Sequence, residues 1–84
     1  MNELGMMVDI SRPEFEARVA ILESKAKKHP FFPEPEVLEY VASSISESIR
    51  ELEGALNIIM VQSQLKNRNL SVLEVKNLLK NNIR

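Results

Sequence analysis

The chain has 84 residues, of which 44% are hydrophobic and 27% charged, and its eleven basic and twelve acidic residues give a net charge of −1. This length fits one small domain, and the composition is typical of a folded globular protein. The near-neutral charge argues against direct binding of nucleic acid. No apolar run could cross a bilayer, so no membrane partner is expected. Without cysteine or a signal-like start, we expect a cytoplasmic protein.

Three Ser-x-x-Glu signatures each open a stretch with helical periodicity, at Ser11–Glu14, Ser48–Glu51 and Ser71–Glu74. In such a capping box the serine oxygen accepts a hydrogen bond from a backbone N–H of the first turn, and the glutamate reaches back to the serine N–H. The glutamate also complements the positive end of the helix dipole. We therefore predict that three helices begin at these positions.

The spacing of hydrophobic residues predicts four helices, at about 12–28, from Pro35 or Glu36 to the serines at 43–46, at 49–66 and at 72–81. Their predicted inner faces carry Phe15, Val19, Leu22 and Ala26; Val37, Leu38, Val41 and Ile45, flanked by Tyr40; Ile49, Leu52, Ala55, Leu56, Ile59 and Met60; and Val72, Val75, Leu78 and Leu79. Three prolines stiffen the loop at 29–35, whose two phenylalanines are expected to fold inward. Residues 67–69 are expected to form a turn.

Met6–Ile10 is the one stretch short and apolar enough to be a strand. A strand needs a neighbour, and the sequence offers none. The predicted fold class is therefore all-α, a small bundle of about four helices preceded by a short orphan strand. The missing sheet suggests an excerpt from a larger protein.

Residues for independent catalysis are missing from the sequence. It has no glycine-rich phosphate loop, no cysteine and a single histidine, His29, which lies beside a proline and is expected to be an exposed residue at a helix end. The usual nucleophile and metal arrangements cannot be assembled from this set, so no metal site is expected. The chain alone is not expected to be an enzyme.

Arg50 and Gly54 stand out in the third predicted helix. A glycine in a helix interior costs about 1 kcal/mol relative to alanine, so we expect another group to approach closely at Gly54. Arg50 lies in the first turn, where its charge opposes the helix dipole. From spacing alone, an intrahelical pair with Glu53 or Glu47 is the favoured interpretation. The alternative is that Arg50 and the free N–H groups of the helix start bind an anion such as phosphate.

Residues 50–57, Arg-Glu-Leu-Glu-Gly-Ala-Leu-Asn, resemble the sensor II helix of the DnaA family, AAA+ ATPases that initiate bacterial chromosome replication. Residues 5–10, and the stretch from Pro13 to Leu22, resemble the same family's passage from its ATPase core into its helical lid. The resemblance covers about residues 5–79. The loop at 29–35 departs from the family pattern because it carries more proline and phenylalanine.

This resemblance implies that residues 1–10 end an ATPase base and that residues 11–84 form the lid that closes over ATP or ADP, bound with Mg²⁺ in the intact protein. Arg50 then corresponds to the sensor II arginine, the catalytic residue that contacts the terminal phosphates. Ile49 and Ile21 are candidates for contacting the adenine ring. The alternative interpretation is that both are ordinary core residues. No nucleotide binding is expected of the chain alone.

The expected partners are the protein's own ATPase base and neighbouring protomers, with origin DNA bound only through a C-terminal domain that this sequence does not contain. Two other functions remain open at this point. One is the lid of a regulatory paralogue that shares the ATPase core and lacks the DNA-binding domain. The other, from a different class, is a free-standing helical module that binds another protein through its apolar faces.

Overall fold

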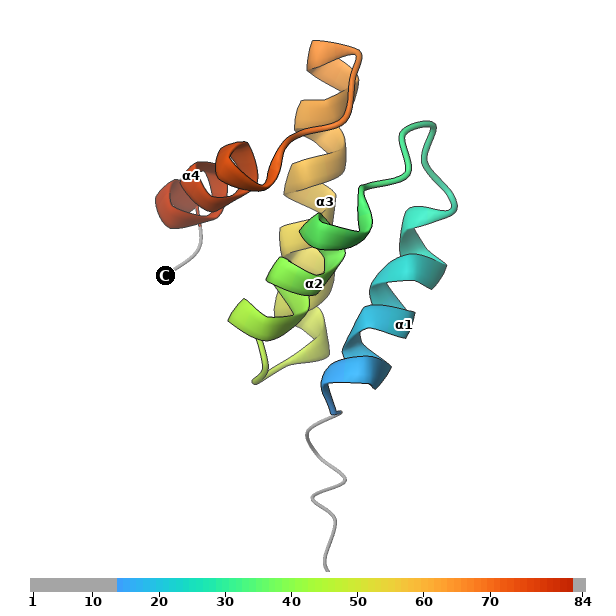
Figure 1. The fold of residues 1–84 in the computed structure, drawn as a ribbon, viewed down its shortest axis with the longest axis vertical. Helices are drawn as coiled ribbons and strands as arrows, with labels where there is room; N and C mark the ends of the chain where they lie inside the picture. The colour runs from blue at the N-terminus through green and yellow to red at the C-terminus, as the bar shows by residue number, and fades with distance from the viewer. Residues whose placement is uncertain (1–13, 83–84) are drawn as a thin grey trace, which may run out of the picture.

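The computed structural model describes residues 14–82, and this part of the chain is entirely helix, turn and loop. Its elements are α1 (Phe15–Ala26), α2 (Pro35–Ser44), α3 (Ile49–Lys66) and α4 (Val72–Asn82) (Figure 1). The all-α prediction with four helices is confirmed. The predicted strand at 6–10, the domain boundary after residue 10 and the predicted cap at Ser11 lie outside the described residues.

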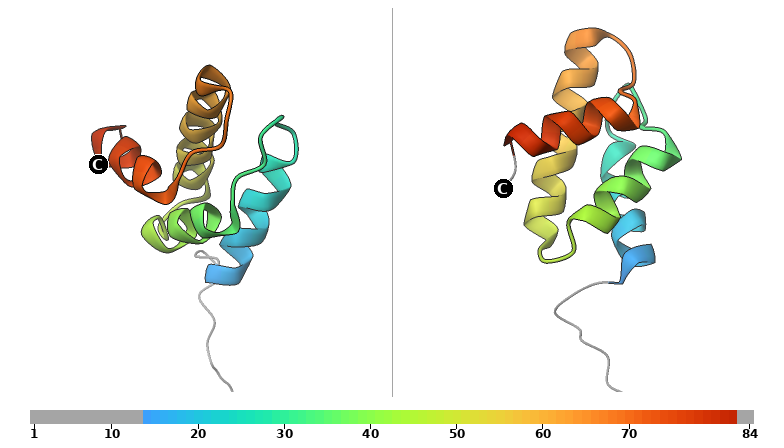
Figure 2. Two further views of the ribbon diagram at one scale, coloured as in Figure 1. Left: turned by 45° about the horizontal axis from the view of Figure 1, so that its top comes forward. Right: turned by 60° about the vertical axis from the view of Figure 1, so that its left-hand side comes forward.

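The four helices form a small bundle. α1 and α3 run in the same general direction, α2 returns in the opposite direction, and α4 crosses α3 (Figures 1 and 2). α1 packs against α2 and α3, and α4 packs against the same two helices. The starts of α1 and α3 therefore lie at one end of the bundle (Figure 1).

The core is formed mainly by the apolar faces that the periodicity predicts, with Ala42 and Leu70 in addition. Its buried residues are Leu22, Ala26, Val37, Leu38, Val41, Ala42, Ile45, Leu52, Ala55, Leu56, Ile59, Met60, Leu70, Val75 and Leu79. Phe15, Ile49 and Phe32 were expected inside but are 40%, 37% and 43% exposed. Phe15 and Ile49 are the first residues of their helices, at the edge of the bundle. Phe32 alternates outward between the half-buried Phe31 and the buried Pro33.

The helix ends show which predicted caps form. At α4 the full capping box is present, because the Ser71 N–H donates to Glu74 Oε1 at 2.9 Å and the Glu74 N–H donates to Ser71 Oγ at 3.2 Å. α3 ends at Asn67, whose left-handed conformation (φ 58°) makes the predicted turn. α1 begins at Phe15 and not at Arg12, because Glu14 is extended, with ψ 165°.

Arg18 is a buried residue that the hydrophobic pattern did not identify. It is 9% exposed, and its Nε donates a 2.7 Å hydrogen bond to the carbonyl of Ala42 in the last turn of α2. The last four carbonyls of a helix lack intrahelical partners, so Arg18 satisfies a group that α2 itself cannot. The guanidinium also lies 5.9 Å from the centre of the Phe15 ring. Arg18 thus fixes α1 against the end of α2.

Replacing Arg18 with alanine should lower the free energy of unfolding by about 1.5–3 kcal/mol, because a buried charge-assisted hydrogen bond is lost. Urea denaturation of the purified chain measures this. The exposed Arg50 offers the matched control, and Arg50→Ala should cost less than about 0.5 kcal/mol. Equal stability of the two variants would contradict the structural role of Arg18.

Arg68 and Glu74 form a bidentate ion pair that stabilises the turn before α4. Arg68 Nη1 and Nη2 donate to the two carboxylate oxygens of Glu74 at 2.9 and 2.7 Å. The hydrogen bonds from Arg68, followed by the one from the Ser71 N–H, lower the pKa of Glu74 from 4.5 to about 2. A lowered folded-state pKa means that the ionised group stabilises the fold above pH 4.5, and that this contribution is lost as the pH falls toward 2.

Glu74→Gln should therefore lower the thermal midpoint at pH 7, with the difference from the parent chain shrinking between pH 4.5 and 2. Thermal denaturation followed by circular dichroism across this range tests it. Glu39→Gln is the control, since Glu39 is exposed and makes no ion pair within residues 14–82. A pH-independent difference would contradict the ion-pair account.

Candidate functional site

The start of α3 is a capped helix end. Ser48 is the N-cap, and its Oγ accepts hydrogen bonds from the backbone N–H groups of Arg50 at 3.1 Å and Glu51 at 3.4 Å. The Leu52 N–H donates to the Ser48 carbonyl at 3.1 Å. The predicted serine cap is thus formed, and it occupies two of the N–H groups that the alternative anion interpretation left free. The guanidinium of Arg50 is therefore the main group that remains here to bind an anion.

Arg50 is exposed, and within residues 14–82 its guanidinium has no ion-pair partner closer than 4.0 Å. The intrahelical pair favoured by spacing is not formed. Glu53 instead contacts Lys25 on α1, with 3.0 Å between Nζ and Oε2. The guanidinium is therefore available to a group from outside the described part of the chain.

Gly54 lies one turn after Arg50 and faces the same way. It is exposed, and a Cβ added there would meet no atom within 4 Å. The predicted close approach is therefore wrong for residues 14–82. A partner that uses this open backbone surface has to come from elsewhere.

Ile21 and Ile49 come from helices that pack together, α1 and α3. Ile21 is half-buried and Ile49 is 37% exposed, and neither belongs to the buried core cluster. The alternative interpretation of both as ordinary core residues is thus not supported. Their proposed contact with adenine stays a prediction.

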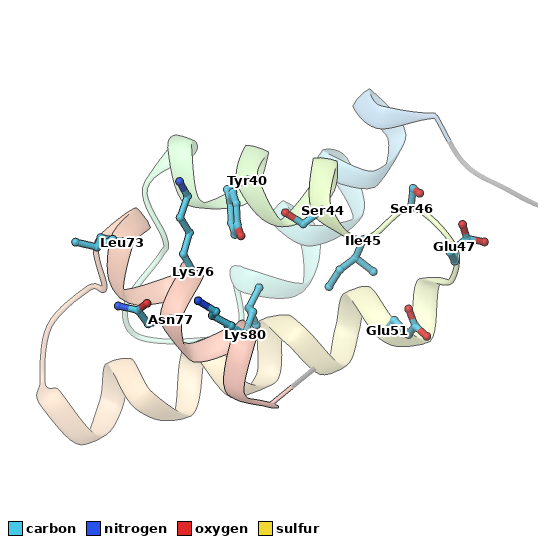
Figure 3. A pocket seen from close by; sticks show the side chains of 11 residues that line it. Tyr40, Ser44, Ile45, Ser46, Glu47, Glu51, Leu73, Lys76, Asn77 and Lys80 are labelled. Carbon is cyan, nitrogen blue, oxygen red and sulfur yellow. The ribbon is translucent and has the colours of Figure 1, made fainter. Parts of the chain in front are cut away.

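A groove of about 770 Å³ lies between the end of α2, the start of α3 and α4 (Figure 3). Glu47 and Glu51 lie toward one end, whereas Lys76 and Lys80 project from α4 toward the other. Lys76 Nζ lies 5.7 Å from the centre of the Tyr40 ring, so this lysine links α4 to α2. No motif in the sequence indicates this groove, because its walls come from three helices.

His29 is half-buried, which corrects the expectation of an exposed side chain. It borders a small depression of about 150 Å³ beside the pair formed by Lys25 and Glu53. In the part of the chain that the structure describes, no cluster of three or more His, Cys, Asp or Glu could hold a metal ion. No helix there is long and apolar enough to span a membrane.

Comparison with known proteins relates this chain to a replication initiator. The chain is 42% identical over 78 residues to the chromosomal replication initiator protein DnaA of Lachnoclostridium phytofermentans. The aligned residues make up 93% of this chain and 17% of that protein. The chain is therefore a homologue of DnaA over a short segment and spans less than a fifth of the relative's length. No family model and no solved structure matches it.

Gly54→Ala should raise the free energy of unfolding by about 0.5–1 kcal/mol, because alanine favours the helix and the added methyl meets open space. Urea denaturation at micromolar chain concentration tests this on the monomer. A loss of stability would show that another part of the chain does approach Gly54.

Proposed function

We propose that this chain is the helical lid of a DnaA-type AAA+ replication initiator and that Arg50 contacts the phosphates of a nucleotide held by another part of the protein. The supporting observation is the 42% identity to DnaA over 78 of the 84 residues. An alignment of that length includes the run at 50–57 that resembles the sensor II helix. This proposal also implies a cytoplasmic protein.

The chemistry of Arg50 suits the proposed contact. An arginine guanidinium carries a positive charge on a planar fork that can donate two parallel hydrogen bonds to phosphate oxygens. Each charge-assisted hydrogen bond is worth about 1.5–3 kcal/mol. In the free chain this side chain is exposed and forms no ion pair with residues 14–82, so binding a phosphate would break no such pair.

The position of Arg50 on α3 can couple a phosphate contact to the whole lid. Ser48 holds the first turn through the N–H groups of Arg50 and Glu51. The inner face of α3 then packs against all three other helices. A displacement of Arg50 would therefore move α3, and with it the core residues that pack against α3. The nucleotide state would in this way set the position of the lid as one body.

The other proposed contacts extend this site. Ile49 lies next to Arg50, and its exposed surface suits the face of an adenine ring, with Ile21 on the neighbouring helix as the second apolar contact. ATP bound with Mg²⁺ supplies the hydrolysable bond, and the remaining phosphate contacts would belong to the ATPase base. Neighbouring protomers, and origin DNA through a separate domain, are the proposed partners of the intact protein.

Arg50→Ala in the intact protein should reduce ATP hydrolysis or ATP-dependent assembly about 10- to 100-fold, since each 1.4 kcal/mol lost is a factor of ten. Steady-state ATPase assays and sedimentation with ATP and ADP measure both. Lys66→Ala removes an exposed charge from the other end of α3 and should change neither.

Unchanged hydrolysis and assembly for Arg50→Ala would remove this residue from the site. The isolated chain should bind ATP only weakly. Micromolar affinity in a calorimetric titration of the 84-residue chain would contradict the proposal that the main phosphate contacts lie in a separate base.

A further inference from the structure

α3 carries a second apolar stripe on the side away from the core. Gly54, Ile58, Val61 and Leu65 follow each other at intervals of four, three and four residues, which places them on one side of the helix. Val61 is 47% exposed, Leu65 is 74% exposed and Ile58 is half-buried. The other three helices are grouped around the opposite side of α3 (Figure 2). We call these four residues the outer stripe.

We infer that the outer stripe pairs with the outer stripe of a second copy of this chain, with the two α3 helices antiparallel. The interval of four and three residues is that of a two-helix coiled-coil seam. The inference rests on this helix face alone and does not require the proposed nucleotide function.

The antiparallel arrangement matches large side chains to small ones. A register centred between Ile58 and Val61 places Gly54 of one copy opposite Leu65 of the other, and Ile58 opposite Val61. An added Cβ at Gly54 would meet no atom within 4 Å, and this open backbone surface then receives Leu65, which is 74% exposed. The helix-interior glycine, which nothing within residues 14–82 explains, acquires a packing role.

The charges also favour two antiparallel copies. No charged residue occurs from Gly54 to Leu65, so the seam is flanked by neutral amides such as Asn57 and Gln64. A parallel pair would instead bring Arg50 to Arg50 and Glu51 to Glu51, and would leave two glycines facing each other across a gap.

The size of the stripe sets the strength of the pairing. It is about 17 Å long, at 1.5 Å per residue, and so buries less surface than a standard protein interface. The dimer should be weak, with a dissociation constant on the order of 0.1–1 mM. It should therefore be sought at high concentration.

Sedimentation equilibrium of the 84-residue chain from 0.02 to about 2 mM tests the association, the range following from the expected affinity. The average mass should rise toward twice that of the monomer, and Val61→Asp should weaken dimerisation at least about tenfold. Leu73→Asp is the control and should leave dimerisation unchanged, because Leu73 lies on α4, outside the stripe, and is even more exposed than Val61, at 66% against 47%. A monomer at every concentration, or a dimer indifferent to Val61→Asp, would overturn the inference.

Cysteine cross-linking tests the direction of the pair, because the chain contains no cysteine. Under mild oxidation, an equimolar mixture of Ile58→Cys and Val61→Cys chains should form mixed disulfide dimers well above the twofold ratio to each homodimer that random pairing gives. Predominant Ile58→Cys homodimers would contradict the antiparallel register.

A size exchange tests the same register without covalent chemistry. Gly54→Leu should abolish pairing through a clash with Leu65 of the other copy, and Leu65→Ala should weaken it. The double variant should recover at least part of the association, because each large residue again faces a small one. No recovery, with circular dichroism showing intact helices, would contradict the arrangement.

Discussion

The burial of one face of α3 is the constraint on which the rest of the structure depends. α1, α2 and α4 all pack against this 18-residue helix, and its residues Leu52, Ala55, Leu56, Ile59 and Met60 are almost completely buried. Because that face is committed to the core, helical geometry turns Arg50 and Gly54 outward. The exposed site and the outer stripe both result from the burial of the opposite face of α3. They adjoin on α3, so nucleotide contact and pairing of two chains would use neighbouring surfaces.

Local signals in the sequence were enough to predict that four helices form and where three of them begin. Pro35 sets the start of α2, the serine caps at 48 and 71 set the starts of α3 and α4, and Asn67 ends α3 as expected. Periodicity also identified most of the core. It could not show that Phe15 and Ile49 lie at helix starts that no neighbour fully covers. Nor could it identify Arg18 as buried, because its partner, the carbonyl of Ala42, belongs to another helix.

The candidate site was predictable only in part for the same reason. The Ser48 cap follows from the sequence, yet the bonds that form it occupy the N–H groups of Arg50 and Glu51 that an anion would otherwise use. The choice of Lys25 as the partner of Glu53 is a tertiary contact across 28 positions, beyond the reach of spacing arguments. Both facts define the role proposed for Arg50 more narrowly. Its guanidinium is exposed, but the backbone N–H groups of Arg50 and Glu51 are already bonded to Ser48 and would not help to bind the phosphate.

The most direct test of the account is an experimental structure of the intact protein with a non-hydrolysable ATP analogue. The proposal predicts that the lid lies over the nucleotide, with the Arg50 guanidinium within about 3.2 Å of a terminal phosphate oxygen, the range of a hydrogen bond. A lid closed over the nucleotide with Arg50 directed into solvent would contradict the proposed role of this residue.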